Sequence, residues 1–417
     1  RYKGEGGRIR CCSMHVDGKT YVVRNDNAAD FMQFLEALSK HTLTCGHNTM
    51  FERRWMIDLG VPPLFLQYDT MLFDYIWHEE HPHDLQSVAA YWCEGAAPWK
   101  MEVEMKEKEW SWETVPDEVL FPYAAMDSYW AHKTCEAQLA KFKGVTDNSI
   151  LEYYENVLLP TSIMCAKYES RGVAIDPEWI AKVRGQYMKE MSEHVKGMGQ
   201  WAPKDFNPAS PKQVSAVMTK LGIETEKTAT GQWSVAADAL ERAKGHKFLS
   251  AYSAWKEKAT LINNFLTKFE EAAGHDDVIH ASWNPAFQVT GRVSGSNPPI
   301  PNTPREPRVR GMVVSRWPKG KILALDYKQL EMRLVASEAN EGNMIQIFEA
   351  GKDVHDETAR LMFGDQFTKE QRAVAKNINF GTVYGISPYS LSLKFHIPER
   401  KAEDFIARHK RAFPKIY

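Results

Sequence analysis

Residues 1–145 alternate between strand-like and helix-like patterns of hydrophobic and polar positions. Two runs with alternating apolar residues, 9–15 and 20–23, flank Asp17-Gly18 and predict a β-hairpin, because this dipeptide favours a tight turn. Further elements of this part are predicted as a strand at 43–45 and helices at 28–40, 46–59 and 122–139. The charged stretch 100–109 is expected to be a solvated face or loop. Such alternation predicts a sheet flanked by helices.

From residue 151 onward the pattern is mostly helical. Amphipathic runs predict long helices at 152–171 and 246–273. Ser210-Pro211 predicts another helix start, with serine as the cap, proline at the first helical position and Gln213 reaching back. Residues 297–307 contain too much proline for a regular element. Basic residues cluster there and just beyond, with Glu306 as the one acid among them: Arg305, Arg308, Arg310, Arg316, Lys319 and Lys321.

The composition is that of an ordinary globular protein. Of the 417 residues, 43% are hydrophobic and 25% are charged, which excludes a disordered or collagen-like chain. Apolar stretches stay below the ~18 residues that span a membrane, so we expect no membrane contact. The net charge is −2, so binding of nucleic acid would require a local basic surface. Six scattered cysteines without a C-x-x-C pair predict a reducing compartment, the cytoplasm of a bacterial or infected cell.

One candidate site residue follows an apolar run. Residues 321–325 predict a buried strand that ends in Asp326, and a carboxylate at the edge of a sheet can hold a metal ion. An aspartate at the end of a strand is, however, more often a turn or cap residue. By itself this pattern therefore leaves both readings open.

A second candidate site is a helix that begins with a capping box, Thr368 to Gln371. It carries Arg372, Lys376, Phe380 and Tyr384 at intervals of four, so these side chains share one face. Two cations so spaced repel each other, which a bound triphosphate would relieve, and the two aromatic rings could stack on a base and sugar. Gly381 and Gly385 weaken a helix unless something approaches its backbone. The alternative is a solvated basic face followed by a core aromatic pair.

Four segments resemble motifs of family A DNA polymerases, the DNA polymerase I group. Residues 326–333 are similar to D-Y-S-Q-I-E-L-R, and residues 372–385 to the fingers helix R-x3-K-x3-F-G-x2-Y-G. Residues 290–294 are similar to T-G-R-L-S, and residues 351–355 to G-K-D-I-H. The segment 298–304 departs from P-N-L-Q-N-I-P: Asn302 matches, but prolines replace the first asparagine and the glutamine. The order and spacing of the motifs make the resemblance specific over about residues 150–417.

The resemblance implies a multidomain α/β and α+β fold. An RNase H-like 3′–5′ exonuclease domain would occupy residues 1–148, and part of a right-hand polymerase residues 149–417. Within the latter, the thumb would span about 151–275, the start of the palm about 276–340 and the fingers about 341–417. We expect a fragment truncated at both ends, without the first exonuclease motif or the C-terminal palm, and therefore inactive by itself.

The family also implies roles for individual polymerase residues. Asp326 and the carbonyl of Tyr327 would hold the metal ions, two Mg²⁺ with Mn²⁺ as an alternative. Lys376 and Arg372 would bind the phosphates, assisted by His355, and Phe380 would lie against the sugar. Tyr384 and Glu331 would exclude a ribose 2′-hydroxyl. The remaining predicted contacts, with primer–template DNA or the incoming dNTP, are Arg292, Asn302, Arg310 and Gln329.

In the first part of the chain, residues 123–127 are similar to the Y-x3-D motif of DnaQ-like exonucleases. Residues 48–52 are similar to the preceding N-x2-F-D motif, with Glu52 in place of aspartate. The resemblance implies that Glu52 and Asp127 bind metal and that Tyr123 orients the attacking water. By itself Y-x3-D is a weak pattern, often a pair on a helix surface.

Two other functions remain as alternatives to a DNA polymerase with proofreading in replication or repair. A phage-type single-subunit RNA polymerase is disfavoured by Glu331 and by the attached exonuclease domain. A non-catalytic DNA-binding relative is disfavoured because Asp326, Arg372, Lys376 and Tyr384 occur together. The sequence names no processivity factor.

A histidine-rich stretch has metal-like spacing without a complete zinc motif. It contains His78, His81, His83 and Asp84. No closed tetrahedral ligand set is apparent, so a surface loop is the favoured interpretation.

Overall fold

The computed structural model describes residues 8–40, 44–61, 66–99, 102–145, 149–236, 239–240, 245–395 and 397–417. The chain divides into two compact units, residues 1–322 and residues 323–417, and each is described by itself. In the described part of the chain, no helix has both the length and the apolar character needed to cross a membrane.

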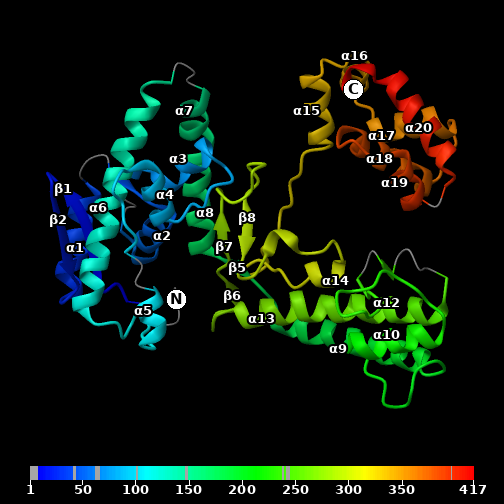
Figure 1. Ribbon diagram of the computed structural model, residues 1–417, viewed down its shortest axis with the longest axis horizontal. Helices are drawn as coiled ribbons and strands as arrows, with labels where there is room; N and C mark the ends of the chain where they lie inside the picture. The colour runs from blue at the N-terminus through cyan, green and yellow to red at the C-terminus, as the bar shows by residue number, and fades with distance from the viewer. Residues whose placement is uncertain are drawn as a thin grey trace. The chain divides into compact units, whose positions relative to one another are not determined.

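The first part of unit 1 contains the predicted alternation of strands and helices (Figure 1). Its elements are β1 (Cys11–Val16), β2 (Lys19–Arg24), α1 (Ala28–Ser39), β3 (Thr44–Gly46), α2 (Met50–Leu59), β4 (Leu66–Asp69), α3 (Thr70–Trp77), α4 (Leu85–Trp92), α5 (Glu102–Glu107) and α6 (Asp117–Phe142). The β1–β2 hairpin is antiparallel and turns at Asp17 and Gly18, both with positive φ, as predicted. The parallel pair β3–β4 forms a separate sheet, so the single sheet expected from the sequence is divided in two.

Two expectations for this part need correction. The stretch predicted as a solvated face or loop contains the short helix α5; residues 106–109 are exposed, but Met105 is buried against Val115 and Leu120. The helix predicted at 122–139 extends over 26 residues and contains Pro122 in its interior. Proline at this position removes one backbone hydrogen bond of the helix, which nevertheless continues on both sides of it.

The second part of unit 1 is mainly helical. It contains α7 (Ser149–Tyr153), a π-helical turn (Tyr154–Leu158), α8 (Leu159–Arg171), β5 (Val173–Ala174), α9 (Pro177–Met198), α10 (Pro211–Lys220), α12 (Lys247–Leu261), a second π-helical turn (Ile262–Thr267), α13 (Lys268–Ala272), β6 (Val278–Ile279), β7 (Ser282–Asn284), β8 (Ser294–Ser296), a 3₁₀ turn (Ile300–Asn302) and α14 (Pro307–Arg310). The long helices α9 and α12 run side by side (Figure 1). Their apolar faces bury Ile180, Val183 and Tyr187, while α10 packs Val214 and Met218 against Phe248. Ser210 caps α10 as predicted, but Gln213 reaches Asn207 instead.

Unit 2 is a compact group of helices. They are α15 (Leu330–Glu338), α16 (Gly342–Glu349), α17 (Val354–Phe363), α18 (Lys369–Val383), α19 (Pro388–Phe395), α20 (Glu399–Ala412) and a final 3₁₀ turn (Pro414–Ile416). One apolar core joins α15, α16 and the end of α20 through Met332, Met344 and Phe413. A second core joins α17, α18, α19 and α20 through Met362, Ile378 and Phe405.

The strand predicted at 321–325 does not form in the structure. Residues 321–327 adopt no regular structure, and Leu323 and Leu325 are 80% and 85% exposed. A strand needs a neighbour to satisfy its backbone N–H and C=O groups, and within the described residues no strand pairs with this segment. Asp326 therefore lies on an exposed, irregular segment rather than at the rim of a sheet.

Candidate functional site

Helix α18 carries the predicted stripe on one face of unit 2. Its capping box is formed, with the Thr368 hydroxyl bonded to the Gln371 N–H and the Gln371 side chain bonded to the Thr368 N–H. Lys376 is exposed, Phe380 is half-buried, and Tyr384 ends the helix with 74% of its surface exposed. The Lys376 Nζ atom lies 5.9 Å from the centre of the Phe380 ring. The cation and the two rings are thus available to a ligand, as the spacing predicts.

Arg372 has acidic partners that the sequence interpretation overlooked. Its guanidinium forms ion pairs with Asp353, at 3.0 Å, and with Asp356. These bonds raise the Arg372 pKa, the largest contribution coming from Asp356. Repulsion between Arg372 and Lys376 therefore does not by itself require a bound anion, because two carboxylates already balance the arginine. Asp353 and Asp356 orient Arg372 and lie at the start of α17.

His355 is held by a buried chain of hydrogen bonds that crosses three helices. The Asn379 Nδ2 atom lies 2.9 Å from His355 Nδ1, and an amide NH₂ can only donate, so Nδ1 is the acceptor. The His355 proton consequently sits on Nε2, which is the tautomer that can donate to a phosphate oxygen. Burial lowers the His355 pKa to about 4, partly offset by the charge of Asp353, so this donor is neutral at pH 7.

The chain of hydrogen bonds continues beyond Asn379. The amide oxygen of Asn379 accepts from the Thr358 hydroxyl at 3.0 Å and from His409 Nε2 at 2.8 Å. His409 Nδ1 then accepts from the Tyr417 hydroxyl at 2.9 Å. Thr358, Asn379 and His409 are fully buried, so each bond would be costly to break. Sequence interpretation missed Asn379 and His409, although a polar residue between Ile378 and Phe380 on a helix with a buried face was a signal.

The remaining predicted polymerase residues of unit 2 lie around α15. Asp326 and Tyr327 are exposed on the irregular segment before the helix. Gln329 caps α15 with a left-handed φ of 56°, and Glu331 lies in the first turn. Helix α15 packs against α18, so Glu331 and Tyr384 belong to neighbouring helices. The predicted cooperation between Glu331 and Tyr384 remains a prediction.

The predicted DNA contacts lie in unit 1. Arg292, Asn302 and Arg310 are exposed, and Arg310 Nε donates to the carbonyl of Pro304 at 3.0 Å. In the basic cluster, Arg308 is instead a structural residue. It pairs with Glu190 at 2.5 Å and with Glu306 at 2.7 Å, and it lies over the Tyr187 ring. The cationic surface left for phosphate is therefore smaller than the sequence count predicts.

The predicted exonuclease acids lie near one another in unit 1. The negative charges of Asp69 and Asp127 act on the carboxyl group of Glu52, which lies on α2. Part of the Glu52 side chain is exposed, but protein atoms surround its carboxyl group. This loss of hydration, together with the charges of Asp69 and Asp127, raises the Glu52 pKa to about 8. Asp127 accepts a hydrogen bond from the Trp99 indole at 2.7 Å. Trp99 was missed by the sequence interpretation, because only the fold brings it to α6.

Two further side chains of this region are Asp69 and Tyr123. Asp69 is fully buried and accepts from the N–H groups of Asn48, Thr49 and Met71, at 2.8–3.0 Å. It therefore ties the β3–α2 turn to the start of α3. Tyr123 packs beside Trp112, with ring centres 6.1 Å apart. Its predicted role in orienting water is not tested by this packing.

Comparison with known proteins identifies the family. The family model of DNA polymerase family A matches residues 177–417, more than half of the chain. The chain belongs to DNA polymerase family A. DNA polymerase I of Synechocystis is 26% identical over an alignment of 385 residues, and the match covers 89% of this chain and 38% of that relative. Thermostable DNA polymerase I of Thermus aquaticus is 32% identical over an alignment of 289 residues, and the match covers 65% of this chain and 34% of the relative.

The fold resembles that of a solved structure over nearly the whole chain. A solved structure, the POL domain of Pol1 from M. smegmatis in complex with DNA primer–template and dNTP, matches with a TM-score of 0.78 and 23% identity. The match covers 97% of this chain and 70% of the other, so the fold likeness includes the strands and helices before residue 149. The chain spans less than two fifths of the length of the two curated relatives named above.

Proposed function

We propose that this family A chain forms the thumb, the start of the palm and the fingers of a template-directed DNA polymerase that adds dNTPs to a primer 3′ end. The observation that supports this most is the α18 face, where an exposed Lys376, an Arg372 oriented by two carboxylates and a His355 with its proton on Nε2 belong to one compact unit. Three such donors suit a triphosphate, whose charge is spread over several oxygens.

The aromatic end of α18 suits the remainder of a nucleotide. Phe380 packs 5.4 Å from His355, ring centre to ring centre, so the sugar would follow directly after the phosphates. Tyr384 would lie beyond it at the insertion site, with Glu331 closing the space for a 2′-hydroxyl. In unit 1, Arg292, Asn302 and Arg310 would contact the primer–template, because exposed cationic and amide groups bind phosphate.

The polymerase would use two divalent metal ions, Mg²⁺ or Mn²⁺, which stabilise the charge that develops during phosphoryl transfer. The described residues fit this requirement only in part. Asp326 belongs to none of the groups of three metal-ligating side chains found among them, and one carboxylate supplies too few ligand atoms to hold two ions by itself. Further ligands would have to join Asp326 to hold two ions.

Proofreading is the second activity that we propose for the whole polymerase. The charge of Asp127 contributes to the raised pKa of Glu52, and such proximity of two acids suits a metal-dependent 3′–5′ exonuclease. The raised Glu52 pKa and the Trp99 bond to Asp127 both oppose metal binding at neutral pH, since a metal must displace a proton and a hydrogen bond. Cytoplasmic location in a bacterial or infected cell also stays a prediction.

Lys376→Ala tests the polymerase proposal in the polymerase that contains this chain. We expect catalytic efficiency with all four dNTPs to fall about tenfold to a hundredfold, since a charged hydrogen bond contributes roughly 1.5–3 kcal/mol. The rate constant should fall together with a rise in the Michaelis constant. Lys369→Ala is the matched control, because Lys369 is equally exposed at the start of the same helix. Equal kinetics of the two variants would rule out a phosphate contact at Lys376.

A further inference from the structure

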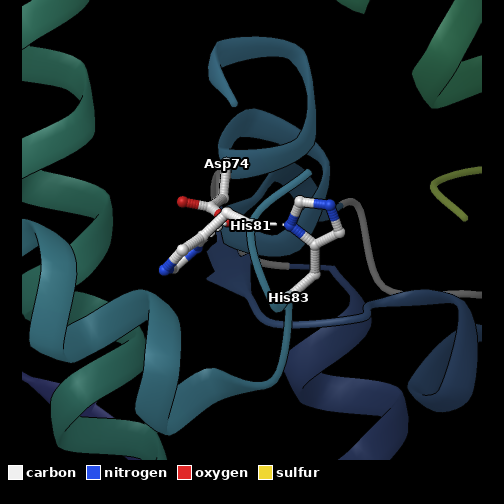
Figure 2. A group of neighbouring side chains, drawn as sticks. All are labelled: Asp74, His81 and His83. Atoms are coloured by element: carbon white, nitrogen blue, oxygen red, sulfur yellow. Dashed lines mark hydrogen bonds and ion pairs between the residues drawn. The ribbon is translucent and has the colours of Figure 1, made fainter. Parts of the chain in front are cut away.

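Three side chains outside the polymerase and exonuclease residues converge at one point in unit 1. Asp74 projects from α3, and His81 and His83 come from the segment between α3 and α4 (Figure 2). The Asp74 Oδ2 atom lies 2.9 Å from His81 Nδ1 and 2.8 Å from His83 Nδ1. All three candidate ligand atoms lie within 4.8 Å of one another. The histidine-rich stretch therefore does form a cluster, with Asp74 in place of Asp84, which caps α4.

The surrounding structure holds these groups in place. The second oxygen of Asp74 accepts from the Trp92 indole at 2.7 Å, so the carboxylate orientation is fixed. His47 bonds to the backbone carbonyl of His83 at 3.0 Å and to the Thr70 hydroxyl at 2.9 Å. Supporting hydrogen bonds of this kind surround the ligands of metal sites in proteins.

The cluster leaves the charge of Asp74 without a permanent counterion. The Asp74 side chain is fully buried, and within the described residues its ion-pair partners are the two histidines rather than a lysine or arginine. A buried carboxylate without a permanent cation is costly. This feature is expected where a bound cation completes the site.

We propose that Asp74, His81 and His83 form a binding site for a zinc-class divalent cation. Two imidazoles and one carboxylate are a ligand set that Zn²⁺ accepts, with the fourth position open to water. Small outward shifts of the side chains would place the three atoms at about 2.0–2.2 Å from one ion. Mg²⁺ is a poor candidate because it prefers oxygen ligands in octahedral geometry. The cation replaces the two hydrogen bonds to Asp74 and neutralises its charge.

A cation at this position would fasten the α3–α4 segment to the core of unit 1. The segment is tied to α3 through Asp74 and, through His47, to the turn that precedes α2. Asp69 anchors the same turn, and Glu52 follows it. A bound cation would therefore stabilise the region that carries the predicted exonuclease acids without being part of them.

Zinc content and affinity test the proposal on the whole chain. The protein is stripped with a chelator, incubated with Zn²⁺ and desalted, and metal is counted by mass spectrometry. Affinity is measured by competition with a chromophoric chelator. We expect one Zn²⁺ per chain that excess Mg²⁺ does not displace, and weaker binding by at least about a hundredfold in His81→Ala. His81 is partly exposed, so this variant should keep its fold.

Controls separate the site from adventitious binding. His132→Ala removes an imidazole that lies beside His15 in the same unit, and it should leave the affinity unchanged. Asp74→Asn keeps the size of the side chain but removes its charge, and it should lose the metal. Co²⁺ in place of Zn²⁺ should show the visible absorption of a tetrahedral nitrogen–oxygen site, lost in His81→Ala. Tryptophan fluorescence, which reports unit 1, should show a higher melting temperature with Zn²⁺.

Two results would overturn the proposal. The wild-type chain could bind no Zn²⁺ in competition with a micromolar chelator, which would show that the imidazoles serve only as hydrogen-bond donors to Asp74. Alternatively, His81→Ala could retain one tightly bound Zn²⁺, which would place the ion elsewhere. Neither result bears on the polymerase proposal, since the cluster shares no residue with it.

Discussion

At the scale of single residues, the electrostatic environment separates side chains that look alike in the sequence. Arg372 and Arg308 are both neutralised by two acidic partners, whereas Lys376 pairs with no acid in the described part of the chain. A cation without an acidic partner interacts more strongly with a phosphate than one whose charge a carboxylate already balances. Lys376 is therefore the residue of this face whose removal should be most specific for nucleotide binding.

Glu331 provides a prediction about sugar choice. Glu331→Ala should admit ribonucleotides, because the side chain would no longer fill the space of a 2′-hydroxyl beside Tyr384. The measurement is the ratio of catalytic efficiencies for dNTP and rNTP in the polymerase that contains this chain. Glu338→Ala, at the other end of α15, is the control. A ratio that stays unchanged in Glu331→Ala would make Glu331 structural and would favour the RNA polymerase alternative.

At the scale of elements, the local packing and backbone conformation explain the two glycines at the end of α18. A Cβ atom on Gly381 would lie 2.7 Å from Ile386 Cγ2, and Gly385 has a φ of 71°. Close approach by Ile386 and a left-handed turn thus explain both residues, and the expected approach by a ligand is not required.

The turn at Gly385 can be tested by substitution. Gly385→Ala should lower the free energy of unfolding by about 1–2 kcal/mol, because a Cβ atom opposes a left-handed backbone. Gly342→Ala is the control: Gly342 begins α16, and its Cβ would meet open space. Urea unfolding followed by far-ultraviolet circular dichroism compares the two. Equal stability would show that residue 385 does not adopt the left-handed conformation.

The buried histidines of α17 and α20 should make unit 2 sensitive to acid. Burial lowers the pKa of His355 and of His409 to about 4, against 6.5 when unfolded. The unfolded chain therefore binds more protons between these pH values, so stability is full above pH 6.5 and falls towards pH 4. The loss is on the order of 3 kcal/mol for each histidine.

Every tryptophan precedes residue 322, so tryptophan fluorescence reports unit 1 and circular dichroism reports both units. Below pH 6, part of the helical circular dichroism signal should be lost at a lower urea concentration than the one that changes the fluorescence. His409→Gln keeps a hydrogen-bond donor for Asn379 but does not titrate, so it should weaken this pH dependence. A pH dependence identical to that of the wild type would contradict the assignment to His409.

At the scale of the whole molecule, the position of Asp326 leads to a prediction about catalysis. Asp326 lies exposed on an irregular segment and joins no group of metal ligands among the described residues. We therefore expect no measurable primer extension by this 417-residue chain with Mg²⁺, although dNTP binding should persist. A gel-based extension assay decides this. Clear extension would show that another carboxylate completes the site.

Local sequence patterns predicted those features that depend on neighbouring residues. The hairpin at Asp17-Gly18, the helix starts at Ser210 and Thr368 and the stripe from Arg372 to Tyr384 all involve groups within a few positions, so backbone geometry alone brings them together. Family motifs added the predicted roles of these residues and the order of the domains.

Contacts between distant residues were decided only by the tertiary structure. Arg372 meets acids 16 and 19 positions away, Trp99 meets Asp127 across 28 positions, and His409 meets Asn379 across 30. The apolar run at 321–325 has the composition of a strand, yet pairing needs hydrogen bonds from another segment, and none of the described strands supplies them. Composition determines what a segment can form, but the partners that the fold brings to it determine what it does form.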